Sequence, residues 1–126
     1  MPASSGSATA PKTDVDLDAI ADNVAVLRER AGSAAVMTVV KADGYGHGAA
    51  AVARAALSAG ATRLGVATLE EALALRADGV DAPLLSWLHL PDADFAAAVA
   101  AGVELSVSGR VHLAAVLAGA RAAGRR

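Results

Sequence analysis

Residues 36–48 of this chain read VMTVVKADGYGHG, and this stretch decides how the rest of the sequence is interpreted. The run before the lysine is rich in valine and threonine, which favours a buried strand because such side chains are stiff at χ1 and fit a pleated surface. Gly44, Gly46 and Gly48 follow, and glycine lets a chain turn freely or approach a ligand closely. Lys41 therefore lies at the carboxyl end of a predicted strand, where barrels and open α/β sheets place their chemistry.

Two interpretations of Lys41 follow from its position. It is either a surface lysine at the end of a strand, as most lysines are exposed, or an amine at the mouth of a pocket that is able to form a Schiff base. Tyr45, four residues further along the glycine loop, is either a half-buried loop aromatic or a phenol held near that amine. Position alone does not decide between these interpretations.

Composition narrows the class of protein. The chain has 126 residues, of which 55% are apolar, with a formal net charge of −2 and no cysteine. This length suits one ordinary domain, and the lack of cysteine excludes disulfides and thiolate metal sites. Nothing indicates a nucleic-acid patch or a membrane-surface helix. Residues 1–12 lack periodicity and are predicted to be a disordered leader. We expect a cytoplasmic protein with no membrane span and no partner nucleic acid.

Helical and strand patterns alternate along the rest of the chain. Four strand–helix units follow a leading helix, which predicts parallel strands with right-handed crossovers, buried on both faces. Four units make either a small open α/β sheet or the first half of an eight-fold barrel, which takes roughly 250 residues when complete. The leading helix begins at Asp16 or Leu17 and ends at Gly32, with Ile20, Val24 and Leu27 as its apolar stripe. The expected strands are residues 34–40, 63–67, 84–88 and 103–107, and the expected helices are residues 48–59, 69–78, 91–101 and one capped by Ser108.

One helix start has a specific signature. Thr68 and Glu71 form a capping box, in which the threonine hydroxyl accepts the backbone N–H of residue 71 and the glutamate reaches back to the start of the helix.

The stretch around Lys41 closely resembles the cofactor-binding motif of alanine racemases, pyridoxal-phosphate enzymes of the (β/α)8 barrel type. In that family the motif runs Val-Val-Lys-Ala, two residues, then Tyr-Gly-His-Gly. Residues 15–20 with Asn23, and residues 68–76 with Gly79 and Pro83, resemble the same family. The resemblance implies an α/β fold in which residues 13–126 form the amino-terminal half of a TIM barrel. The carboxyl-terminal half and the β-domain would be absent, so we expect an amino-terminal fragment that is inactive alone.

The resemblance also assigns roles to three residues. Lys41 would hold pyridoxal 5′-phosphate and act as one of two bases that exchange the α-proton of alanine. Tyr45 would hydrogen-bond the cofactor phosphate, and Trp87 would line the cofactor pocket. The family's second base is a tyrosine of the partner subunit in a homodimer with shared active sites. The implied function is interconversion of L- and D-alanine, which supplies D-alanine for peptidoglycan.

Several alternatives stay open. His47 is a general base, a metal ligand or, as we expect, a residue that braces Lys41 or Tyr45; His89 and His112 lack ligand spacing, so no metal site is predicted. His89 lies just past a strand end and is a weaker candidate for the pocket. Asp43 is expected to tie the loop to its own backbone. The alternative functions are a single-domain pyridoxal-phosphate carrier without racemase activity and a gene product with no function of its own. The substrate is alanine, serine or another small amino acid.

Overall fold

The structure is a computed structural model that describes residues 10–126, so most of the predicted leader lies outside the described residues. The first element is α1, Leu17–Ala31. The Asp16 carboxylate caps it by accepting the backbone N–H of Ala19 at 3.0 Å, and it ends at Gly32, whose φ of +61° suits glycine. Val24 is buried as predicted, but Leu27 is 60% exposed, so the predicted stripe is narrower than expected.

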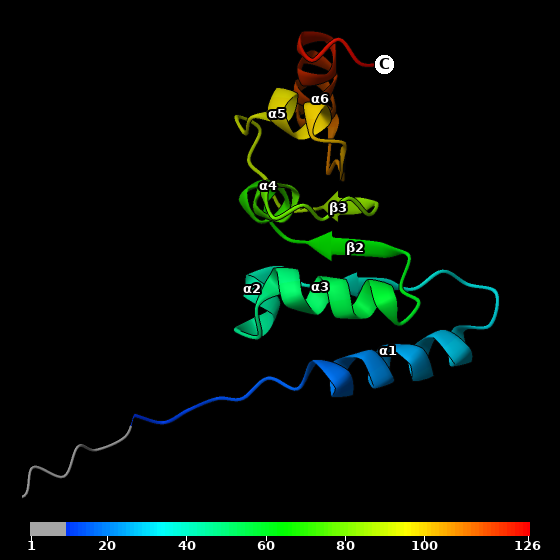
Figure 1. The fold of residues 1–126 in the computed structure, drawn as a ribbon. Helices are drawn as coiled ribbons and strands as arrows, with labels where there is room; N and C mark the ends of the chain where they lie inside the picture. The colour runs from blue at the N-terminus through cyan, green and yellow to red at the C-terminus, as the bar shows by residue number, and fades with distance from the viewer. Residues whose placement is uncertain (1–9) are drawn as a thin grey trace, which may run out of the picture.

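Four strands form one parallel sheet in the order β1-β2-β3-β4 (Figure 1). This order confirms the four strand–helix units and the α/β fold predicted from the sequence, although the strands are shorter than expected. The strands are β1 (Met37–Val39), β2 (Arg63–Val66), β3 (Leu84–Ser86) and β4 (Val103–Leu105), and the helices between and after them are α2 (Lys41–Tyr45), α3 (Ala49–Ser58), α4 (Leu69–Ala77), α5 (Phe95–Ala100) and α6 (Arg110–Ala122).

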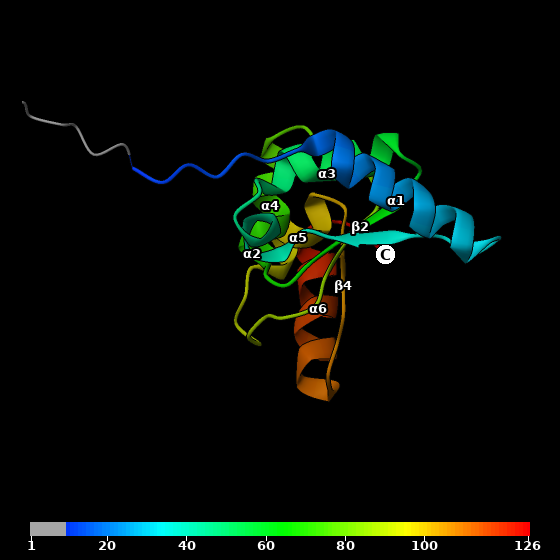
Figure 2. The ribbon, with the colours of Figure 1, turned by 90° about the horizontal axis from the view of Figure 1, so that it is seen from below.

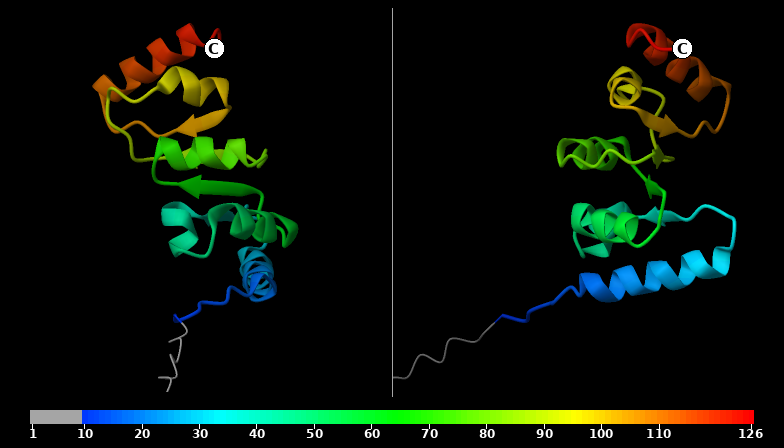
Figure 3. Two further views of the ribbon diagram at one scale, coloured as in Figure 1. Left: turned by 60° about the vertical axis from the view of Figure 1, so that its left-hand side comes forward. Right: turned by 45° about the vertical axis from the view of Figure 1, so that its right-hand side comes forward.

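The helices cover one face of the sheet and leave the other face open. Figure 3 shows α3, α4 and α5 on the same side of the strands, and Figure 2, seen from below, shows α1 beside α3. Leu64, Leu84 and Val103 are paired across the sheet and buried against these helices. Each such leucine contributes about 1.5–3 kcal/mol to folding relative to an exposed one.

The open face contradicts our expectation that the strands would be buried on both sides. Val39, Gly65, Leu85 and Glu104 lie in register across the four strands, and Val39 is 49% exposed. Side chains of a strand alternate between its two faces, and the face opposite the helices would be the interior of a closed barrel. The apolar runs therefore reflect a barrel interior that this chain alone does not fill.

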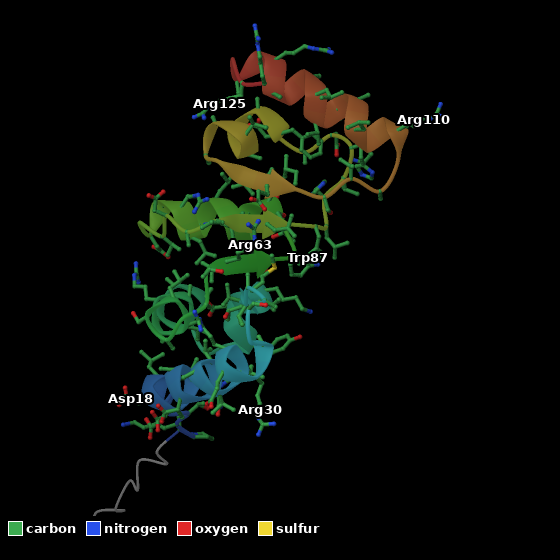
Figure 4. All side chains as sticks on the ribbon, turned by 90° about the vertical axis from the view of Figure 1, so that its right-hand side faces the viewer. Asp18, Arg30, Arg63, Trp87, Arg110 and Arg125 are labelled. Carbon is green, nitrogen blue, oxygen red and sulfur yellow. The ribbon has the colours of Figure 1, made fainter. Side chains whose placement is uncertain are left out.

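One ion pair crosses the open face. The guanidinium of Arg63 on β2 contacts the carboxylate of Glu104 on β4, so the pair spans the intervening strand β3. Arg63 is labelled in Figure 4, where its strand lies in the middle part of the sheet. The pair is partly exposed, so it contributes little to stability.

One arginine forms several hydrogen bonds at the edge of the sheet where the strands begin. Arg76, in the last turn of α4, donates to the carbonyl oxygens of Val80 and Ala82 at 2.8 Å each, of Ala101 at 2.9 Å and of Gly102 at 3.1 Å. These carbonyls precede β3 and β4. A planar guanidinium with five donors can serve several acceptors at once, so Arg76 joins two helix–strand connections.

The last two helices begin later than predicted. Asp94 caps α5 by accepting the N–H of Ala97 at 3.0 Å, so Pro91 belongs to the preceding turn. Ser108 does not cap α6; its hydroxyl lies 2.6 Å from Nδ1 of His112. Nothing among residues 10–126 forms a helix with the length and hydropathy needed to cross a membrane.

Candidate functional site

The carboxyl ends of the strands lie at one edge of the sheet, because all four are parallel. Lys41 comes one residue after Val40, whose N–H continues the β1–β2 ladder by donating to the carbonyl of Gly65 at 2.9 Å. Trp87 comes directly after β3. The sequence therefore brings the candidate amine and the candidate pocket wall to the same edge.

The short segment labelled α2 is a tight left-handed turn and not a right-handed helix, and it occupies the place where the sequence predicted a loop holding three glycines. The backbone φ angles are +52° at Ala42, +55° at Asp43, +62° at Gly44 and +54° at Tyr45. Left-handed backbone costs roughly 1–2 kcal/mol per residue for residues other than glycine. Gly44 donates its N–H to the carbonyl of Val40 at 3.0 Å, which closes the turn.

Asp43 holds the end of this turn against α3. Its carboxylate accepts the N–H of Ala49, the first residue of α3, at 2.8 Å, and its carbonyl accepts the N–H of Gly48 at 2.9 Å. The expectation that Asp43 ties the loop to its own backbone is confirmed. Aspartate also tolerates left-handed backbone better than most residues, which suits its place in the turn.

Lys41 and Tyr45 come together across the turn. The Lys41 amine, Nζ, lies 5.2 Å from the centroid of the Tyr45 ring. The lysine is half-buried and the tyrosine is 73% exposed. The phenol therefore projects from the edge of the sheet with the amine beside it.

His47 contacts the backbone of the turn. Its Nδ1 lies 3.2 Å from the carbonyl oxygen of Tyr45, and its ring is exposed. This contact fits a residue that braces Tyr45. No cluster of three or more His, Cys, Asp or Glu side chains suited to a metal ion occurs within residues 10–126.

Trp87 lies over Gly65 on the open face. A Cβ atom added to Gly65 would stand 2.7 Å from Cζ3 of Trp87 and 3.0 Å from Sδ of Met37. The indole and the thioether therefore fill the space above the only residue of β2 that has no side chain. Together, Trp87 and Met37 form an apolar surface on the open face of the sheet, which we call the apolar floor.

Glu71 is the residue of this edge whose part the sequence interpretation missed. The predicted capping box is present: the Thr68 hydroxyl accepts the N–H of Glu71 at 3.2 Å, and the Glu71 carboxylate accepts the N–H of Thr68 at 3.0 Å. The same carboxylate also accepts the N–H of Ala67 at 2.9 Å and that of Ala42 at 2.7 Å. The capping pattern signals the first contact but not the contact with Ala42, which is 29 residues away in the sequence.

These contacts explain the charge state of Glu71. Burial alone would raise the pKa of the carboxyl, but hydrogen bonds from the N–H groups of Thr68, Ala42 and Ala67 outweigh it and hold the pKa below its usual value. The carboxylate is therefore ionised at neutral pH.

His89 faces a different space. It lines a cavity of about 500 Å³ together with Thr68, Leu69 and residues 92–94, and its Nε2 lies 2.8 Å from the carbonyl oxygen of Ser106. The lining of this cavity does not include Lys41, Tyr45 or Trp87. His89 therefore belongs to the β3–α5 connection, not to the pair formed by Lys41 and Tyr45.

The fold and the site together define a segment of a parallel β/α barrel with an amine and a phenol at the carboxyl end of its first strand. Residues 15–126 match the family described as "Alanine racemase, N-terminal domain". The chain belongs to this alanine racemase N-terminal domain family.

Individual relatives agree with the family match. The chain is 63% identical over 110 residues to a protein named alanine racemase from Mycobacterium ulcerans, covering 87% of this chain and 28% of that protein. The crystal structure of alanine racemase from Streptomyces lavendulae matches with a TM-score of 0.86 and 48% identity, covering 90% of this chain and 31% of that one. A structure named histidine racemase, from Leuconostoc mesenteroides, matches with a TM-score of 0.74 and 30% identity, covering 87% of this chain and 30% of that one. The chain thus spans less than a third of these relatives.

Proposed function

We propose that this chain supplies the pyridoxal 5′-phosphate attachment lysine and the phosphate-binding tyrosine of an alanine racemase. The observation that carries the proposal is the pairing of the Lys41 amine with the Tyr45 ring, 5.2 Å apart, at the carboxyl end of β1. Membership of the alanine racemase N-terminal domain family supports the same assignment.

The residues of this edge fit the cofactor. Lys41 is half-buried, and the one ion pair found in the described part of the chain joins Arg63 to Glu104, so no carboxylate neutralises the amine. The exposed phenol of Tyr45 provides a hydroxyl donor for a phosphate oxygen. Trp87 and Met37 provide an apolar surface over Gly65. An amine, a phosphate donor and an apolar wall are the groups that an aromatic aldehyde phosphate requires.

Each residue then has a defined task. Pyridoxal phosphate, when bound, withdraws electrons from the α-carbon of an amino acid and so acidifies its proton. Lys41 would hold the cofactor through its amine, and the same amine would take the proton removed from one face of the α-carbon. Tyr45 anchors the phosphate, and Trp87 keeps water from one side of the site.

The remaining parts of the activity belong to the proposal as well. Residues 13–126 form the amino-terminal part of the barrel, and the second base, a tyrosine of the partner subunit in a homodimer, lies outside this chain. The product D-alanine serves peptidoglycan synthesis in the cytoplasm. Because a structure named histidine racemase shares this fold at 30% identity, the fold of this segment does not by itself select the substrate.

A hybrid protein tests this function. The 126 residues replace the matching part of the Mycobacterium ulcerans relative, to which 110 of them align over 28% of its length. We expect the hybrid to convert L-alanine to D-alanine, the Lys41→Ala variant to lose this activity, and the matched Lys12→Ala variant to retain it. A folded hybrid that binds pyridoxal phosphate without racemising alanine would support the carrier alternative and contradict the proposal.

A further inference from the structure

Glu71 connects two strand ends at the edge of the sheet that carries Lys41. Its Oε1 accepts the N–H of Ala42, directly after Lys41, at 2.7 Å, while Oε2 accepts the N–H groups of Ala67 and Thr68 at 2.9 and 3.0 Å. Ala42 follows β1, and Ala67 follows β2. One carboxylate thus bridges the connections that leave two paired strands.

The contact with Ala42 is not needed for capping α4. A capping box requires only that the glutamate accept the N–H of the N-cap residue, and Oε2 does this at Thr68. Oε1 is left free to reach the other connection, and it does so at the shortest distance of the three. The second oxygen therefore serves the turn that follows Lys41.

That turn needs an external support. Ala42, Asp43 and Tyr45 are not glycines, yet all have positive φ. Strained backbone persists only when surrounding contacts determine it strongly. Ala42 is the first residue of the left-handed stretch, and a hydrogen bond from its N–H to an ionised carboxylate is stronger than one between neutral groups.

We propose that Glu71 is a positioning residue, whose carboxylate fixes the left-handed turn and thereby sets the place of the Lys41 amine relative to the Tyr45 phenol. The importance of Glu71 for catalysis rests on the function proposed above. The hydrogen bond by which Glu71 fixes the turn does not depend on that function. Loss of the carboxylate releases the Ala42 N–H and lets the turn relax. The amine and the phenol then lose the relationship that a single cofactor molecule would require.

Amide hydrogen exchange in the full chain tests the proposal without any cofactor. In Glu71→Ala we expect the Ala42 amide to exchange roughly 10- to 100-fold faster, as for loss of a hydrogen bond to a charged group. Glu71→Gln keeps one carbonyl acceptor and should give a smaller acceleration, so it carries the test if Glu71→Ala does not fold.

Two controls separate positioning from helix capping and from charge. Thr68→Ala removes the hydroxyl half of the capping box and leaves the carboxylate in place, so Ala42 should keep its protection relative to the rest of the chain. Glu70→Gln removes the same charge from the same first turn of α4 at an exposed position, and it should leave Ala42 unchanged. Equal acceleration in Thr68→Ala and Glu71→Ala would overturn the proposal.

A second readout links the turn to the lysine. Pyridoxal phosphate is added to the hybrid protein, the product is fixed with borohydride, and the rate of labelling at Lys41 is measured. We expect Glu71→Ala to slow this labelling about tenfold or more, and Glu70→Gln to label at the normal rate. If the unmodified hybrid also fails to label, the proposed function fails, while the exchange of Ala42 still decides the role of Glu71.

Discussion

The amine of Lys41 and the ring of Tyr45 lie 5.2 Å apart, although the four residues from Ala42 to Tyr45 all have positive φ. A regular strand or a right-handed turn would direct these two side chains differently. The left-handed turn is thus the local structure that joins the candidate attachment site to the candidate phosphate contact.

Replacing Tyr45 with phenylalanine tests the phosphate contact. The phenylalanine keeps the ring beside Lys41 but removes the hydroxyl donor. We expect pyridoxal phosphate to bind the hybrid protein about tenfold or more weakly, because a hydrogen bond to a charged group contributes about 1.5–3 kcal/mol. Spectroscopic titration with the cofactor measures the change.

Pyridoxal, which lacks the phosphate, is the matched ligand for this variant. Its affinity should be the same for Tyr45→Phe and for the unmodified protein. An equal loss of affinity for both ligands would show that the hydroxyl acts on the turn and not on the phosphate.

Gly65→Ala tests the apolar floor. The added methyl would stand 2.7 Å from the Trp87 ring and 3.0 Å from the Met37 sulfur, so the indole must move. Overpacking of this kind costs about 1–3 kcal/mol. Trp87 is the only tryptophan of the 126-residue chain. The fluorescence spectrum of this chain should therefore shift, and its urea unfolding should give the loss of stability.

The control for this substitution is Gly109→Ala. Gly109 has extended backbone, with φ of 179°, and nothing lies within 4 Å of an added Cβ. We expect neither the fluorescence nor the unfolding midpoint to change by a comparable amount. A silent Gly65→Ala variant would contradict the packing of Trp87 described here.

Arg76→Lys tests the opposite edge of the sheet. A lysine ammonium is a compact charge and does not serve four separate carbonyls in the way the guanidinium does. We expect a loss of about 1–3 kcal/mol in the free energy of unfolding, with cofactor labelling at Lys41 unchanged in the folded protein. Arg110→Lys, at an exposed position labelled in Figure 4, is the matched control and should be neutral.

Acidification tests the charge of Glu71. Its folded-state pKa lies below the usual value of 4.5, so the folded chain binds this proton less readily than the unfolded chain. The carboxylate therefore stabilises the fold fully above the unfolded pKa, and this contribution is lost as the pH falls through the folded pKa. Unfolding measurements should show Glu71→Gln destabilised near neutral pH, with the difference from the unmodified chain shrinking below about pH 4.5.

Thr68→Ala gives the comparison for this pH series. Its hydroxyl accepts the backbone N–H of Glu71, a contact that does not titrate, and it makes the smallest of the contributions that lower the pKa of the Glu71 carboxyl. Most of the destabilisation caused by Thr68→Ala should therefore persist on acidification. A Glu71→Gln difference that stays constant or grows as the pH falls would contradict the role of the ionised carboxylate.

The sequence predicted the arrangement of elements better than the site. The spacing of apolar residues and the positions of glycine and proline predicted the four strand–helix units. The predicted capping box at Thr68 and Glu71 is also present. The same signals misplaced the start of α6, because Ser108 bonds His112 instead of capping the helix. The apolar runs also predicted strands buried on both faces, which is wrong for this chain. An apolar run does not show whether other parts of the protein cover the second face of the sheet.

The details of the site depend on contacts between distant residues. The left-handed backbone at Ala42 has no local signature, as alanine rarely adopts it. The bond from Ala42 to Glu71 joins positions 29 residues apart, and a single sequence carries no signal for such a pair. The packing of Trp87 on Gly65 likewise follows from strand register.

The most direct test of the central claim is the site of covalent labelling by pyridoxal phosphate. The chain has two lysines, Lys12 and Lys41. After borohydride reduction and tryptic digestion of the cofactor-loaded hybrid, a pyridoxyl group on Lys41 blocks cleavage there and leaves peptide 31–54, whereas one on Lys12 leaves peptide 1–28. Our account predicts the label within peptide 31–54 and its loss in Lys41→Arg. Label on Lys12 alone, or equal labelling of the Lys41→Arg variant, would contradict it.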